Sequence, residues 1–174
     1  MLKGLAPEEV IGPTQMRGLG LYRIGIWVYR AVGTAIAIAA MEALARGLDE
    51  PLIRVPFVTS IVLTLTLPDS EAAQPYAVIG GHALSTAAGF AALWCVGAGT
   101  AASAIAVGIA ALLMLSSRTV HPPAGIDAFL VPLLGLPLGW AWNPVLAGAV
   151  LLAAFAKTWA AGEKLALRAL MGSA

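Results

Sequence analysis

The sequence is poor in the residues that soluble domains and most enzymes depend on. Only 11% of its 174 residues are charged, histidine occurs twice, and Cys95 is the single cysteine. With 60% hydrophobic residues and a mean hydropathy of +0.88, the chain lacks the polar side chains needed to cover a soluble surface. These scarcities exclude a soluble globular domain and an internal disulfide, and they indicate a polytopic membrane protein.

A surplus of charge of one sign is also missing. Ten Lys and Arg residues face nine Asp and Glu residues, giving a net charge of +1, and most of the cations lie at the ends of apolar segments. We therefore expect no nucleic-acid partner. The chain also lacks a zinc-binding HExxH pair, a phosphate-cradling loop and a Ser/His/acid set on convincing elements, so we expect neither an enzyme nor a cofactor.

A metal site would have to be built from the two histidines. His82 and His121 could combine with Asp127 or Glu42, but these residues lie on different segments with no ligand spacing to support the idea. We predict no metal ligand.

The long apolar runs predict an all-α fold with about six membrane-embedded helical segments. A polar loop or a proline separates each run from the next. The chain is expected to form one transmembrane domain, made of an interfacial N-terminal segment (1–23), a first half (24–97), a second half (101–163) and a C-terminal tail (164–174).

The two halves follow the same order: a spanning helix, a short proline-opened segment, a loop and a second spanning helix. Pro56 and Pro122 are 66 residues apart, as are Val78 and Pro144, which suggests an internal repeat. The repeat is inverted if the short segments cross the membrane and parallel if they re-enter. The Lys/Arg distribution favours crossing, and both arrangements put the two termini in the cytoplasm of a bacterial inner (plasma) membrane.

The most unusual stretch is the polar, proline-interrupted segment 116–129. Pro122 and Pro123 cannot lie inside a helix but suit its first turn, so the helix that ends near Arg118 should restart there. Hydrocarbon offers no partner for the backbone groups that such a break leaves unpaired. Shortened, proline- and glycine-interrupted segments in both halves predict a binding site near the membrane midplane.

Other polar residues within the apolar runs have two interpretations each. Glu42 is a member of a structural ion pair or a pathway group, and Arg30 is expected to snorkel to the headgroups. Ser60 lies in a hydroxyl-rich run that either forms hydrogen bonds within the bundle or lines a polar path. The pair Gly80-Gly81 permits close helix packing, and His82 beside it needs buried partners.

Several motifs occur in the order that is typical of one protein family. Arg-Thr-Val-His-Pro-Pro-Ala-Gly at 118–125, together with Pro-Asp-Ser at 68–70, Gln74-Pro75 and Ile-Gly-Gly-His at 79–82, resembles the HPP family of small integral membrane proteins. The resemblance covers roughly residues 57–150. It implies four or more membrane helices, and some members are associated with nitrite transport in plastids and cyanobacteria. Asp127 departs from the pattern, and a carboxylate there must be paired or protonated beside an anion.

These observations predict one anion site. A helix that starts at Pro122 or Pro123 would point unpaired amides and the positive end of its dipole at the ligand. The predicted substrate-binding residues are Arg118, Thr119, His121, Pro122, Pro123, Ala124 and Gly125, facing Gly80, Gly81 and His82; Glu42, Ser60 and Asp127 are predicted as pathway or structural polar residues. The competing interpretation is that Arg118 pairs with Asp127 or Glu42 and only holds the break.

We therefore predict a transporter or channel for a small inorganic anion, with nitrite as the favoured substrate. His82 and His121 would be neutral donors, or would share a proton taken up with the anion, in which case uptake rises as the pH falls toward about 6.5. The alternative is a non-transporting sensor or assembly module. Besides the anion and membrane lipid, the expected partner is a second copy of the chain, because short helices rich in Gly and Ala invite close packing.

Overall fold

The structure is a computed structural model that describes residues 13–47 and 54–172. All regular elements in these ranges are helical. The long helices are α2 (Pro13–Gly47), α4 (Pro75–Val96), α5 (Thr100–Ser117) and α7 (Ala147–Gly172), and the short ones are α3 (Arg54–Thr66) and α6 (Gly125–Leu134). One-turn elements precede three of them: η2 (Glu71–Ala73) before α4, η3 (Pro122–Ala124) before α6 and the π-helical η4 (Ala141–Leu146) before α7. The all-α prediction is confirmed.

Four helical stretches are long and apolar enough to cross a membrane, namely Tyr22–Gly47, Pro75–Val96, Thr100–Ser117 and Ala141–Ala169. Helices α3 and α6 have 13 and 10 residues, which corresponds to about 20 and 15 Å against a hydrocarbon core of about 30 Å. The two short segments predicted from the prolines are therefore present in the fold.

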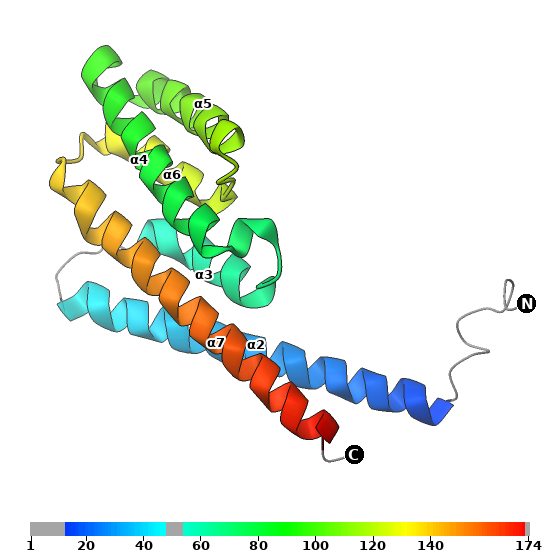
Figure 1. Ribbon diagram of the computed structural model, residues 1–174. Helices are drawn as coiled ribbons and strands as arrows, with labels where there is room; N and C mark the ends of the chain where they lie inside the picture. The colour runs from blue at the N-terminus through cyan, green and yellow to red at the C-terminus, as the bar shows by residue number, and fades with distance from the viewer. Residues whose placement is uncertain (1–12, 48–53, 173–174) are drawn as a thin grey trace, which may run out of the picture.

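Consecutive helices run in alternating directions along the bundle (Figure 1). Helices α4, α5 and α6 pack together on one side, α2 and α7 cross each other on the other side, and α3 lies between the two groups. As a result, the N-terminal end of α2, the loop from α3 to α4, the break between α5 and α6 and the C-terminal end of α7 gather at one end of the bundle.

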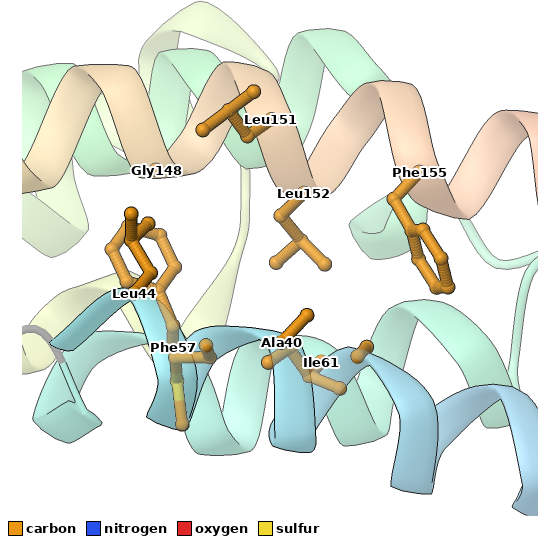
Figure 2. Close-up of a pocket in the computed structure, with 10 residues that line it drawn as sticks. Ala40, Leu44, Phe57, Ile61, Gly148, Leu151, Leu152 and Phe155 are labelled. Atoms are coloured by element: carbon orange, nitrogen blue, oxygen red, sulfur yellow. The ribbon is translucent and has the colours of Figure 1, made fainter. Parts of the chain in front are cut away.

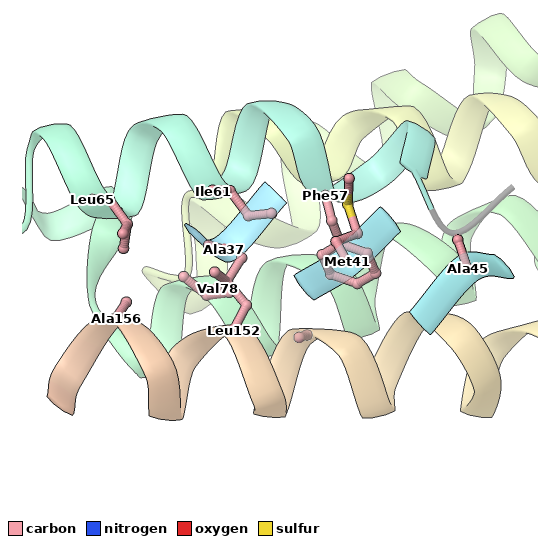
Figure 3. Close-up of a cluster of buried hydrophobic side chains, with 10 residues drawn as sticks. Ala37, Met41, Ala45, Phe57, Ile61, Leu65, Val78, Leu152 and Ala156 are labelled. Atoms are coloured by element: carbon pink, nitrogen blue, oxygen red, sulfur yellow. The ribbon is translucent and has the colours of Figure 1, made fainter. Parts of the chain in front are cut away.

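The core is apolar and rich in small residues. Phe57, Ile61 and Leu65 of α3 pack against α2 and α7 (Figure 3). Alanines dominate where α4, α5 and α6 meet, because small side chains allow close approach of helix backbones where lipid provides no hydrophobic drive between helices.

The end of the bundle where α2 begins and α7 ends is joined by polar contacts. Arg30 Nε and Nη2 donate to the two carboxylate oxygens of Glu163 at 2.9 and 2.7 Å, and Arg30 Nη1 donates to the carbonyl oxygen of Thr66 at 3.0 Å. Arg30, which the sequence predicts to snorkel to the headgroups, thus has a carboxylate on α7 and the end of α3 as its partners. We call this region the polar end.

Two helix boundaries differ from the prediction. Helix α2 begins at Pro13, inside the segment predicted to be interfacial, because proline suits the first position of a helix. Helix α7 continues to Gly172, through most of the predicted tail, since its Glu, Lys, Leu, Ala, Arg and Met residues are good helix formers.

Candidate functional site

The break between α5 and α6 is built as its prolines predict. Helix α5 ends at Ser117, and Arg118 adopts the left-handed conformation (φ 59°, ψ 29°), with its amide donating to the carbonyls of Met114 and Leu115. His121 is extended, and the chain restarts as η3 at Pro122. The left-handed residue turns the chain and the prolines begin the next helix.

The break packs directly on the glycine pair of α4. A Cβ on Gly81 would lie 2.7 Å from Cβ of His121 and 3.2 Å from the carbonyl oxygen of Thr119, and one on Gly80 would lie 2.8 Å from Cγ2 of Thr119. Real Cβ atoms do not approach so closely, so glycine is required where His121 and Thr119 contact α4. The structure therefore brings the His-Pro-Pro break and the Gly-Gly-His turn together.

Four fully buried side chains meet behind this contact, and we call Ser60, His82, His121 and Asp127 the polar network. Nδ1 of His82 lies 2.6 Å from Oδ2 of Asp127. Oγ of Ser60 lies 3.1 Å from Nε2 of His82 and 3.0 Å from Nε2 of His121. The two imidazole rings have centroids 5.3 Å apart. Ser60 thus connects the two histidines, and Asp127 has the partner that its charge requires.

The network is anchored to backbone at its outer end and incomplete at its inner end. Nδ1 of His121 lies 2.7 Å from the carbonyl oxygen of Ala72 in η2, so this nitrogen donates. Asp127 Oδ1 and Thr86 Oγ1 are buried and have no hydrogen-bond partner among the described residues. Thr86 lies one turn beyond His82 on α4, farther from the polar end.

The depth of the network follows from its position on α4. His82 is the eighth residue of this 22-residue helix, about 10 Å from its start in a helix about 33 Å long. The network therefore lies about one third of the way along α4 from the polar end.

A polar depression of about 280 Å³ opens at the polar end, and we call it the vestibule. Lys157 and Lys164 of α7 and Asp69 of the α3–α4 loop line it, together with Gln74 and Thr64. Thr64 Oγ1 donates to the carbonyl oxygen of Ser60 at 2.8 Å, so one turn of α3 separates the vestibule from the network. A depression of similar volume between α2, α3 and α7 is apolar (Figure 2).

Several predicted site residues lie outside the network. Arg118 is exposed in a separate depression of about 520 Å³ with Glu71 and Tyr76, and Asp127 pairs with His82 instead of with Arg118. The Thr119 hydroxyl contacts that of Ser117 at 2.7 Å. Glu42 lies on α2, where its carbonyl oxygen accepts a hydrogen bond from Nε of Arg46.

The sequence predicts unpaired amides at the start of the helix after the prolines. This prediction is wrong for the amides of Ala124 and Gly125, which both donate hydrogen bonds. The Ala124 amide donates to the carbonyl oxygen of His121 at 3.0 Å, and the Gly125 amide donates to those of Pro122 and Pro123. The 3₁₀ turn formed by the prolines tightens the first turn, so these carbonyls reach the amides. The amides of Ala124 and Gly125 are therefore not available to an anion.

The sequence predicts no Ser/His/acid set, but the structure brings a serine, a histidine and an aspartate into contact. Ser60, His82 and Asp127 are connected in that order, although 22 and 45 residues separate the contacting pairs in sequence. No local spacing could reveal the set, since it depends on how three helices pack. Of the vestibule residues, Asp69 and Gln74 lie in motifs, whereas Lys157 and Lys164 resemble ordinary interface cations in the sequence. Within residues 13–47 and 54–172, no group of three His, Cys, Asp or Glu side chains is placed to hold a metal ion.

Comparison with known proteins decides the family. The family model "HPP, transmembrane region" matches residues 21–164, which is most of the chain. The chain belongs to the HPP family. A transmembrane protein of Dictyostelium discoideum is 29% identical to this HPP-family chain over 137 residues, which cover 72% of the chain and 48% of that protein. The chain thus spans about half the length of this relative. No solved structure matches it.

Proposed function

We propose that this HPP-family protein transports a small inorganic anion, with nitrite as the first candidate. The observation that carries the proposal is a polar network buried one helical turn beneath a vestibule lined by two lysines. Lys157 and Lys164 attract an anion to the polar end, which we place in the cytoplasm. His82 pairs with Asp127, so the carboxylate does not face an incoming anion as an uncompensated charge.

Nitrite uptake into proteoliposomes tests the proposal. We expect liposomes with the purified protein to take up nitrite faster than protein-free liposomes. The double variant Lys157→Gln/Lys164→Gln should lower the uptake rate about tenfold at low salt. The matched Lys157→Arg/Lys164→Arg variant keeps both charges and should keep most of the rate. A folded protein that passes no nitrite would support the sensor or assembly module instead.

The chain of contacts from Ser60 to His82 to Asp127 favours a second candidate, a hydrolase with a serine nucleophile. Two features weigh against it. Ser60 is fully buried, and its hydroxyl lies within hydrogen-bonding distance of the carbonyl oxygen of Pro56 and of a second imidazole, that of His121. A fluorophosphonate probe decides between the candidates: we expect no labelling of Ser60, and labelling that Ser60→Ala abolishes would establish the hydrolase.

A further inference from the structure

The Ser60 hydroxyl has more neighbours than it can serve with its one hydrogen. It can donate one hydrogen bond and accept two. Around it lie the carbonyl oxygen of Pro56 at 3.0 Å, Nε2 of His82 at 3.1 Å and Nε2 of His121 at 3.0 Å. The carbonyl oxygen can only accept, so the protonation of the two imidazoles decides which contacts are hydrogen bonds.

One proton shared by His82 and Asp127 satisfies Ser60 and both imidazoles at zero net charge. Whether the pair is imidazolium with carboxylate or imidazole with carboxylic acid, Nε2 of His82 carries a hydrogen and donates it to Ser60. Because Nδ1 of His121 donates to the carbonyl oxygen of Ala72, Nε2 of a neutral His121 is bare and accepts from Ser60.

A second proton also fits without the loss of a hydrogen-bonded contact for any imidazole. If Nε2 of His121 is protonated, both histidines donate to Ser60, and the hydroxyl turns to the carbonyl oxygen of Pro56. Removing the shared proton is different, because two bare Nε2 atoms would then face one hydrogen beside an uncompensated buried carboxylate. Ser60 and the two imidazoles therefore have two fully hydrogen-bonded states that differ by one proton on His121.

We infer that the polar network binds a proton that is co-transported with the anion, one proton per anion, and that His121 carries it. The inference rests on the proposed function. Proton uptake takes the network from zero to one positive charge, which favours an anion at Thr64 on the floor of the vestibule.

The other charged side chains near the network line the vestibule or are paired with each other. Lys157, Lys164 and Asp69 surround the vestibule, and Arg30 is paired with Glu163. Helix α5 has no charged residue in its sequence, and α3 contributes Ser60 and Thr64. Nδ1 of His121 donates to the carbonyl oxygen of Ala72, so the added proton binds Nε2, which faces Ser60 inside the bundle.

Coupling is measured in proteoliposomes with sodium nitrite as the probe and a pH-sensitive dye inside. We expect an inward proton gradient to accelerate uptake about tenfold over the rate at equal pH, after subtraction of protein-free liposomes. His121→Asn keeps a donor for Ala72 but cannot take up a proton, so it should pass nitrite at a pH-independent rate. Ser103→Ala removes a buried hydroxyl that bonds only within its own helix and should behave as wild type.

Nitrite uptake by the wild type that moves no protons would overturn the inference and leave the proposed function standing, whereas no uptake by any variant would refute the proposed function itself. A readout independent of transport uses the two histidines of the chain, whose ring nitrogens give two sets of ¹⁵N signals in detergent. His121 should gain one proton as the pH falls toward about 4, because burial of its imidazole lowers its pKa to about that value. If neither ring titrates in folded protein, the site binds no proton and the inference fails.

Discussion

At the scale of single residues, the site depends on positions where one atom more or less changes the contacts. Gly81 allows His121 to approach α4, and Ser60 connects two imidazoles that have no direct hydrogen bond to each other. Buried polar groups stabilise a bundle only when all of them are satisfied, so such a network tolerates few substitutions.

The Gly81→Ala variant tests the close contact. The added Cβ would lie 2.7 Å from Cβ of His121, so the break must shift and His121 must move away from Ser60. We expect a loss of about 1–3 kcal/mol in the free energy of unfolding and of most transport. Gly108→Ala on α5, where the new Cβ meets nothing within 4 Å, is the control and should change neither in thermal unfolding or flux assays.

The Arg118→Gly variant separates the turn from the side chain. Arg118 is left-handed, a conformation that costs a residue with a Cβ about 1 kcal/mol, so glycine should stabilise the protein by about 0.5–1 kcal/mol in thermal unfolding. The exposed guanidinium lies outside the vestibule, so we expect nitrite flux to change by less than about twofold. A severe loss of flux in this stabilised variant would restore Arg118 as an anion ligand.

At the scale of elements, the short helices α3 and α6, the long helix α4 and the break before η3 carry the network, and the long helices α2 and α7 support it. A break places polar side chains inside the bundle, where hydrogen bonds from neighbouring helices satisfy them. Arg30 and Glu163 hold α2 and α7 together beside the end of α3, where Thr66 accepts from Arg30.

Two ion pairs of different burial test this support. The Arg30 and Glu163 side chains are 21% and 10% exposed, so Glu163→Gln should cost about 2–4 kcal/mol by leaving a largely buried guanidinium without its counter-charge. Lys164 and Asp69 are 66% and 76% exposed at 3.9 Å, and Asp69→Asn should change stability by less than about 0.5 kcal/mol. Chemical denaturation in detergent measures both, and equal costs would mean that the buried pair does not join the helices.

At the scale of the whole molecule, cations are distributed unevenly between the two ends. Arg118, Lys157, Lys164 and Arg168 lie at or toward the polar end, whereas Arg46 lies near the other end of α2. From the positive-inside rule we predict that the polar end, with the N-terminal end of α2 and the C-terminal end of α7, faces the cytoplasm.

Cysteine labelling tests this orientation. In a Cys95→Ser background, a cysteine at Ser70 in the α3–α4 loop should react with a membrane-impermeant maleimide only after the cells are opened. A cysteine at Ala98, in the turn between α4 and α5, should react in intact cells. The reverse labelling pattern would mean that the polar end, and with it the opening of the vestibule, faces away from the cytoplasm.

We also predict that the protein is a homo-oligomer. Helix α2 is only 17% buried over its apolar window and exposes Trp27, Val28 and Val32 on a surface that a second copy can cover. Native mass spectrometry from detergent should give a multiple of 17.7 kDa. A monomer that still takes up nitrite would refute the prediction.

The sequence by itself determined the membrane class, the helical fold, the two short segments and the place of the break, because hydropathy and proline act locally. It also identified His82, His121, Ser60 and Asp127 as polar residues in an apolar setting. Only the tertiary structure decided how they pair. His82 on α4 pairs with Asp127 on α6, and Arg30 pairs with Glu163, which is 133 residues away in the sequence. Partners across helices depend on helix rotation and depth, which no local pattern encodes, and the closed amides at Ala124 and Gly125 depend on a 3₁₀ turn that proline spacing alone does not specify.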